Sequence, residues 1–170
     1  MLGELTIRDA VVDDAPWLGL AHAIAVEEAY GHYFPEEFMQ RNTVERRTQM
    51  WAETLALDSG DAQKPRVVVA ESDSQIVGFG AFGPARDADA PMDYELWRLY
   101  VLSSAYGTGL ATRMLHALDP DRTPSYLWVM EKNTRAIAFY RKHGYQPDGA
   151  VEHLKLIGDL PKIRMTRSTG

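Results

Sequence analysis

Two glycines in the short stretch YGTGLA, residues 106–111, follow a strand-like run and precede a helix-like pattern. Backbone N–H groups at the start of a helix, together with the helix dipole, favour a bound anion. Glycine carries no Cβ, so a ligand can approach its backbone closely. Strand-to-helix turns also use glycine for conformation alone. The stretch therefore leaves two interpretations open, a phosphate-binding loop and a plain turn.

Two familiar phosphate loops do not fit this stretch. A P-loop requires a lysine directly after its last glycine, and none follows Gly109. The dinucleotide fingerprint requires a third glycine where Thr112 stands. That fingerprint also belongs to the first strand–helix unit of a domain, whereas this loop lies late in the chain.

Two longer motifs include and follow the loop. Residues 99–115 read LYVLSSAYGTGLATRML, and residues 127–145 read LWVMEKNTRAIAFYRKHGY. In order and separation they resemble the two diagnostic motifs of the GNAT superfamily of acyl-CoA-dependent N-acetyltransferases. The first, V-x-x-x-x-[QR]-x-x-G-x-[GA], has on its key positions Val101, Tyr106, Gly109 and Ala111. The second, V-x-x-x-N-x-x-A-x-x-F-Y-x-x-x-G-[FY], is met by Val129, Asn133, Ala136, Phe139, Tyr140, Gly144 and Tyr145.

The resemblance implies that acetyl-CoA is the cosubstrate, with no metal, and that it lies where strand 96–102 splays from strand 126–130. The pantetheine arm would pair with the backbone of strand 96–102, and the pyrophosphate would lie on N–H groups of the glycine loop, which is then a pyrophosphate cradle. The cofactor residues so implied are Leu99, Tyr100, Val101, Tyr106, Gly107, Thr108, Gly109, Leu110, Ala111, Thr112, Asn133 and Tyr140.

Tyr106 stands where the family usually carries glutamine or arginine. If this position contributes a backbone N–H, tyrosine serves equally well. If a side-chain contact to phosphate matters, the cofactor binds more weakly. Asn133 likewise has two interpretations, since Asn before Thr-Arg-Ala-Ile is a good helix N-cap on local grounds alone.

Tyr140 and Glu95 are the residues expected to carry the chemistry. By resemblance, Tyr140 is a general acid, and a phenol with a pKa of about 10 holds its proton at neutral pH. An aromatic on an apolar helix face is otherwise a core residue. Glu95 is the expected general base, because strand alternation places it on the side of Trp97, Leu99 and Val101; the alternative is a solvated acid at a strand start.

The acceptor pocket is expected between the first two helical segments. An aromatic cluster there lies beside carboxylates, a combination that suits an organic ammonium group, although it would also serve as a hydrophobic seal. The residues expected to contact the acceptor are Glu27, Tyr30, His32, Tyr33 and Phe34.

The elements that must position these residues alternate along the chain. Arg66–Ala70 and Ile76–Phe82 form a hairpin signature, and Gly144 stands where a left-handed helix cap belongs. Strands are expected at 5–8, 66–70, 76–82, 94–102, 125–130, 151–157 and 163–167. Helices are expected from Asp13 or Asp14 to Glu28, over 36–57 as one long or two shorter helices, over 108–118, and after Asn133.

The order of elements predicts one α/β domain over residues 1–170. In the GNAT-like form that the resemblance implies, a mixed sheet of six to seven strands is flanked by about four helices and splays between the fourth and fifth strands. The chain has no cysteine, which excludes disulfides and a thiolate nucleophile, and its histidines lack metal-ligand spacing. A net charge of −6 argues against nucleic acid.

We therefore expect a cytoplasmic N-acetyltransferase that acts by direct attack of a primary amine, without a membrane partner and with a possible homodimer. The expected acceptor is a small or polyamine-like amine, ahead of a peptide N-terminus, a lysine side chain or an aminoglycoside. Three alternatives stay open: a non-catalytic acyl-CoA sensor on the same fold, a protein or peptide N-acetyltransferase, and an unrelated nucleotide-binding α/β protein.

Overall fold

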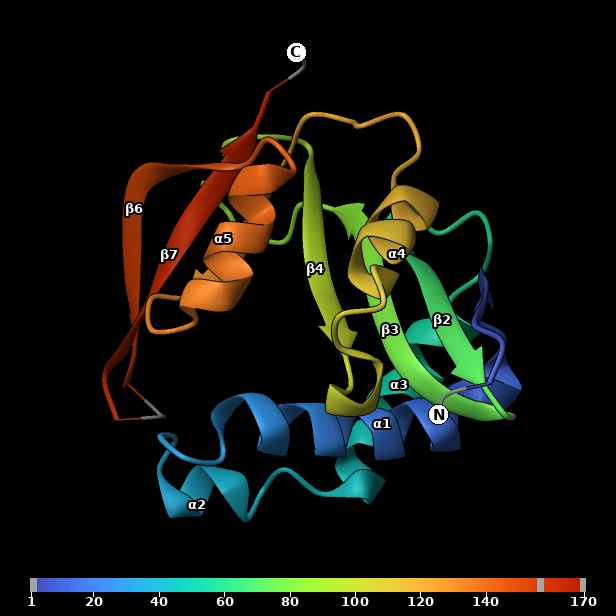
Figure 1. Cartoon of the computed structure of the whole chain (residues 1–170). Coiled ribbons are helices and arrows are strands. Elements are labelled where there is room, and N and C mark those ends of the chain that lie inside the picture. The colour runs from blue at the N-terminus through green and yellow to red at the C-terminus, as the bar shows by residue number, and fades with distance from the viewer. Residues whose placement is uncertain (1–2, 156–157, 169–170) are drawn as a thin grey trace.

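A seven-stranded mixed sheet organises the chain, whose computed structural model describes residues 3–155 and 158–168. The spatial order is β1-β2-β3-β4-β5-β7-β6, and the β4–β5 pairing is parallel (Figure 1). The strands are β1 Thr6–Asp9, β2 Arg66–Ser72, β3 Gln75–Pro84, β4 Tyr94–Val101, β5 Ser125–Met130, β6 Gln146–Leu154 and β7 Leu160–Arg167. The helices are α1 Ala15–Tyr30, α2 Glu36–Met39, α3 Val44–Ala56, α4 Leu110–Leu118 and α5 Thr134–Lys142.

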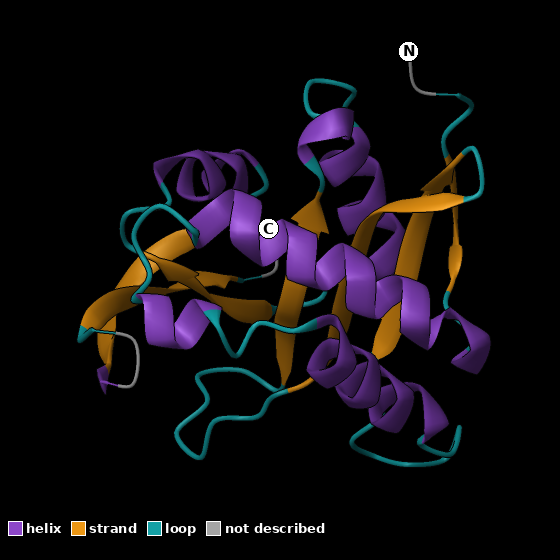
Figure 2. Cartoon of the chain, turned by 90° about the horizontal axis from the view of Figure 1, so that it is seen from below, coloured by secondary structure: helices purple, strands orange, loops and turns teal. Residues whose placement is uncertain are grey.

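Each face of the sheet carries its own hydrophobic core. Side chains of α4 and α5 pack on one face, around residues such as Met114, Leu127 and Met165. Those of α1 and α3 pack on the other, around Trp51 and Phe79. Figure 2 shows the long helix α1 lying across the strands on this second face. The mixed α/β sheet with helices on both faces confirms the predicted fold class.

The predicted hairpin is confirmed and extends further than expected. β2 and β3 pair antiparallel down to Ser72 and Gln75. Asp73 and Ser74 connect them with φ angles of 50° and 63°. Two successive positive φ angles are typical of a type I′ turn, whose twist matches that of the flanking strands.

The helical region before the hairpin has the two-helix form of the prediction, but the expected side-chain cap of the first helix is wrong. Residues 36–57 form two helices, and Thr43 caps the second by accepting a bond from the Arg46 N–H. Asp14 precedes α1 without capping it, because its carboxylate accepts instead from the Arg8 guanidinium and the Val11 N–H. These bonds, the Arg8 contact above all, lower the pKa of Asp14. The described residues form five α-helices where about four were expected, and α2 and α3 are separate.

The last two strands begin before their predicted starts. β6 starts at Gln146 and includes a register shift between Pro147 and Val151, where Gly149 has a φ of 93°. A bulge of this kind hides a strand from an alternation pattern. β7 starts at Leu160 rather than 163. Residues 156 and 157 of the expected strand 151–157 lie outside the described residues.

The sheet opens between β4 and β5. These strands pair only at Tyr94 with Ser125 and at Glu95 with Tyr126, and beyond these pairs they diverge. This confirms the predicted splay between the fourth and fifth strands. No helix within the described residues is long and apolar enough to cross a membrane.

Candidate active site

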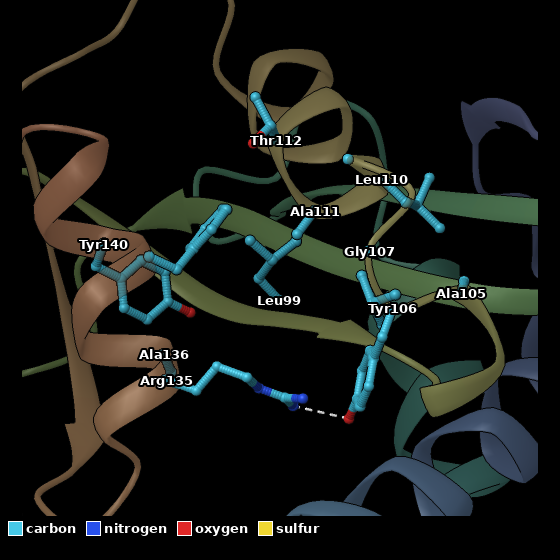
Figure 3. Close-up of a pocket in the computed structure, with 13 residues that line it drawn as sticks. Leu99, Ala105, Tyr106, Gly107, Leu110, Ala111, Thr112, Arg135, Ala136 and Tyr140 are labelled. Atoms are coloured by element: carbon cyan, nitrogen blue, oxygen red, sulfur yellow. Dashed lines mark hydrogen bonds between the residues drawn. The ribbon is translucent and has the colours of Figure 1, made fainter.

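A cavity of about 290 Å³ lies over the opening, between β4, the glycine loop and α5 (Figure 3). β4 contributes Leu99 and Val101 to it. The remaining lining comes from the loop, the start of α4 and one face of α5: Ala105, Tyr106, Gly107, Gly109, Leu110, Ala111, Thr112, Arg135, Ala136, Phe139 and Tyr140. Most of the residues predicted to hold the cofactor therefore meet in one place.

Gly107 and Gly109 both have a φ of 76°, a conformation that other residues rarely adopt. A Cβ added at either position would meet no atom of the described chain within 4 Å. The glycines thus shape the backbone and at the same time keep the cavity wall free of side chains. The two interpretations of the loop are compatible, because the same backbone conformation makes the turn and leaves room for an anion.

Five backbone N–H groups of this loop and of the first turn of α4 donate to no acceptor within the described chain. They belong to Gly107, Thr108, Gly109, Ala111 and Thr112. The Leu110 N–H is bonded to the Thr108 hydroxyl, which itself donates to the Ala105 carbonyl. Unpaired N–H groups at a helix N-terminus form an anion site.

The Tyr106 hydroxyl contacts Arg135, a residue that the sequence patterns did not predict for the site. The Arg135 guanidinium donates to the Tyr106 hydroxyl at 2.8 Å and lies 3.9 Å from the centre of its ring (Figure 3). Arg135 is the charged residue of the cavity lining. A positive charge therefore stands at the loop although the chain lacks the usual Gln or Arg at position 106. The two residues are 29 positions apart, so no local pattern reveals the pair.

A bulge in β4 changes which of its residues share a face of the sheet. Its register with β3 shifts so that Ala81 pairs with Arg98 and Phe82 with Leu96, which leaves Trp97 as an extra residue. Leu99 and Val101 consequently pack toward α4 and α5, whereas Trp97 and Tyr100 pack toward α1 and α3. The assumption that Glu95, Trp97, Leu99 and Val101 share one side is therefore wrong.

The β4 backbone also faces the opening at alternate residues. The Leu102 N–H donates to Val77 of β3, and Tyr100 lies two residues away, opposite Phe79. Antiparallel pairs alternate between residues that bond the partner strand and residues that point away from it. Leu99 and Val101 therefore direct their N–H and C=O groups toward the gap, where an extended ligand has partners.

Tyr140 lies on α5 against the opening, with its hydroxyl directed toward β4 (Figure 3). It is 9% exposed and lines both the loop cavity and a narrower one within the gap. Burial, reinforced by nearby Tyr30, raises its pKa above the ordinary value of a phenol. The group holds its proton across the physiological range.

A second cavity, of about 130 Å³, lies in the gap between β4 and β5. It shares Leu99 and Tyr140 with the loop cavity. It shares Tyr30, Arg98 and Tyr100 with a third cavity, of about 660 Å³, on the α1 side. Through these shared residues the three cavities adjoin one another from the glycine loop to the opposite face; we call the second the passage and the third the acceptor-side cavity.

The residues predicted to hold the acceptor divide between two places. Tyr30 and Phe34 stack with ring centres 4.6 Å apart and line the acceptor-side cavity. His32 and Tyr33 line a different hollow, near Lys132 and Asn133. Glu27 is exposed and lines none of the cavities described here. Of the predicted cluster, Tyr30 and Phe34 therefore line the acceptor-side cavity, whereas His32, Tyr33 and Glu27 do not.

Asn133 caps α5, since its side chain accepts from the Ala136 N–H, and this confirms the local interpretation. Its amide also donates to the Tyr30 hydroxyl and lines the passage. It does not line the loop cavity.

Glu95 is 2% exposed at the closed end of the opening. The Arg86 guanidinium and the Tyr126 hydroxyl both donate to it. It lines none of the three joined cavities. These contacts favour a structural role, fastening β4 to β5 below the gap, over proton transfer.

We expect Gly109→Ala to raise the Kd for acetyl-CoA at least about tenfold, a cost of roughly 1.4 kcal/mol. The new Cβ would enter the space that the loop leaves open, and a positive φ also disfavours alanine. The matched control is Gly149→Ala in β6, where φ is 93° and a Cβ is equally unobstructed. Calorimetry should find tight binding in the control, and equal affinities in the two variants would contradict the cradle.

Comparison with known proteins identifies the family. The model of the acetyltransferase (GNAT) domain matches residues 63–147, half of the chain. The chain belongs to the GNAT family, whose members are acyl-CoA-dependent N-acetyltransferases, which bears out the resemblance seen in the two motifs.

Relatives agree with this assignment. The uncharacterized N-acetyltransferase YuaI of Bacillus subtilis is 22% identical over 153 residues, which cover 87% of this chain and 83% of that protein. An uncharacterized N-acetyltransferase of Mycobacterium tuberculosis is 34% identical over 88 residues, 49% of this chain and 54% of that protein.

Solved structures show the same fold. The PaiA N-acetyltransferase of Thermoplasma acidophilum, crystallised with coenzyme A, has a TM-score of 0.74 at 16% identity, covering 96% of this chain and 99% of that chain. YncA of Salmonella typhimurium, solved with its cofactor acetyl-CoA, has a TM-score of 0.69 at 18% identity, covering 96% and 93% of the respective chains.

Proposed function

We propose that this protein transfers an acetyl group from acetyl-CoA to the amine of a small molecule, with the two substrates meeting in the gap between β4 and β5. One observation carries the proposal: five N–H groups of the loop and α4 have no acceptor among the described residues, and they lie at one end of a row of adjoining cavities that continues past Tyr140 to the acceptor-side cavity. A pyrophosphate fits the N–H groups, and an extended pantetheine arm fits the free backbone edge of Leu99 and Val101. Family relatives solved with coenzyme A or acetyl-CoA support this choice of cofactor.

The reaction proceeds in this proposal by direct attack. The amine nitrogen, approaching from the acceptor side, forms a bond to the thioester carbonyl carbon. The Val101 N–H stabilises the oxyanion that develops. The carbon–sulfur bond then breaks and the thiolate takes the proton of the Tyr140 hydroxyl. The nitrogen, which attacked as the neutral amine, releases one proton to water on the acceptor side, and water returns a proton to the Tyr140 oxygen.

Titration calorimetry with acetyl-CoA, CoA, ATP and NAD tests the cofactor. We expect acetyl-CoA and CoA to bind and ATP and NAD to bind at least tenfold more weakly. If ATP or NAD bound as tightly as acetyl-CoA, the result would favour an unrelated nucleotide-binding protein. Binding of acetyl-CoA without CoA release, over a broad panel of amines and peptides, would favour a non-catalytic sensor.

Arg135→Gln is expected to raise the KM for acetyl-CoA roughly tenfold, because a charge-assisted contact to phosphate is lost. Arg135 lies at the exposed mouth of the cavity, so the difference from wild type should shrink as salt rises. Arg141→Gln, on an exposed position of the same helix, is the control. A KM unchanged in Arg135→Gln at low salt would show that Arg135 does not hold the cofactor.

A further inference from the structure

The acceptor-side cavity has a positive lining. Arg47 of α3 and Arg98 of β4 both line it. Lys155 and Lys162 lie at its β6–β7 side. Its carboxylate is Glu152, and this group is paired with Lys162 at 3.0 Å. The cavity lining is thus positively charged, whereas the carboxylates near Tyr30 in the sequence had led us to expect a negatively charged one.

The two guanidinium groups lack a carboxylate partner among the described residues. Arg47 donates to the side-chain oxygen of Asn42 at 3.0 Å. Within the part of the chain that the structure describes, the Arg98 side chain has a weak contact to the sulfur of Met50 and lies 5.7 Å from the ring centre of Trp51. Both are half-buried. Burial lowers the pKa of Arg98 to about 10 and lowers that of Arg47 as well.

Half-buried charges without counter-charges are costly, and a bound anion would remove that cost. The planar guanidinium fork suits a carboxylate, which accepts two parallel hydrogen bonds. Arg98 lines both the acceptor-side cavity and the passage to Tyr140. A carboxylate held there keeps the rest of the same molecule close to the gap.

The rest of the lining is largely aromatic. Phe34 stacks on Tyr30 and meets Phe38 edge-on, with ring centres 5.1 Å apart. Tyr100 and Trp128 complete the aromatic surface. An apolar or aromatic body fits these walls, with its anionic end at the arginines and its amine toward the gap.

We propose that the acceptor is an amine that also carries a carboxylate, an amino acid with an apolar or aromatic side chain, held by Arg47 and Arg98. The inference rests on the proposed acetyl transfer and adds the class of acceptor. A polyamine would bring further positive charge against the arginines and is disfavoured.

Matched acceptor pairs test this proposal in a CoA-release assay. Each apolar or aromatic amino acid is compared with its decarboxylated amine, for example phenylalanine with phenethylamine, and spermidine and O-phosphoethanolamine are included. We expect at least one carboxylated member to exceed its partner in kcat/KM by roughly 10- to 100-fold, as for a hydrogen bond to a charged group. Arg98→Gln and Arg47→Gln should each reduce this preference, and Arg141→Gln should preserve it.

Acetyl-CoA titration of the same variants separates this inference from the proposed function. Both cavity variants should bind acetyl-CoA as the wild type does, which also reports that they are folded. If wild-type protein binds no acetyl-CoA, the proposed function fails. If it binds acetyl-CoA but no pair prefers the carboxylate, or spermidine or the phosphorylated amine is the best acceptor, the present inference is wrong. The inference is also wrong if the preference for the carboxylated acceptor is unchanged in both Arg98→Gln and Arg47→Gln.

Discussion

Tyr140→Phe is expected to turn over roughly 10²- to 10⁴-fold more slowly than the wild type, the usual contribution of a positioned general acid. Acetyl-CoA affinity should change little, because phenylalanine retains the ring that lines the passage. The rate falls because the variant has no hydroxyl to donate a proton to the leaving thiolate of CoA. The thiol of cysteine, with a pKa of about 8.5, is a guide to how readily this thiolate is protonated.

The pH profile adds a second test of this role. Burial raises the pKa of Tyr140, so the phenol stays protonated through pH 9 and no alkaline fall in kcat should arise from this group. The variant should consequently be slower by a similar factor at every pH from 6 to 9. A rate ratio that closes steadily toward pH 9 would assign the effect to another group.

Tyr145→Phe is the matched control for the chemical role. Tyr145 is fully buried near Tyr140, with ring centres 6.0 Å apart, but its hydroxyl is bonded to Ser125 and lines none of the three joined cavities. This variant should lose stability while its kcat stays close to the wild-type value. Equal kcat values for Tyr140→Phe and wild type, in stopped-flow or steady-state assays, would exclude Tyr140 as the acid.

Asp119→Asn is expected to lower the free energy of unfolding by about 3–5 kcal/mol, since removing one partner leaves a buried charge uncompensated. Asp119, at the end of α4, pairs with Arg167 of β7, and their side chains are 2% and 4% exposed. Arg167 also donates to the Thr123 carbonyl and the Ser125 hydroxyl, just before and at the start of β5. The pair therefore fixes α4, β5 and β7 together at the closed end of the opening.

Urea unfolding monitored by circular dichroism measures this effect. The comparison is Glu152→Gln, which breaks the more exposed pair with Lys162, where side-chain exposures are 51% and 19%. Exposed pairs contribute about 0–1 kcal/mol, so this control should hardly move the unfolding midpoint. If the free energy of unfolding fell by the same small amount in both variants, the pair of Asp119 and Arg167 would not contribute more to stability than an exposed pair.

Local patterns determined much of the fold and the cofactor side of the site. The Asn133 cap, the hairpin before β4 and the helix after the glycine loop each depend on residues close in sequence, and backbone geometry expresses such signals directly. The same holds for the loop itself, because glycine alone lacks a Cβ and therefore adopts a positive φ at little cost. The two motifs were enough to predict the family, and with it the splay between β4 and β5.

Only the tertiary structure decided what faces the acceptor. The bulge puts Trp97 on the side of Tyr100 and away from Leu99 and Val101, and strand alternation read from the sequence could not reveal an extra residue. Arg47 lies 51 positions before Arg98, and the Tyr106–Arg135 contact spans 29, so neither arrangement leaves a periodic trace. Charge recognition depends on which side chains converge and lack a partner, and that is settled when distant strands and helices pack.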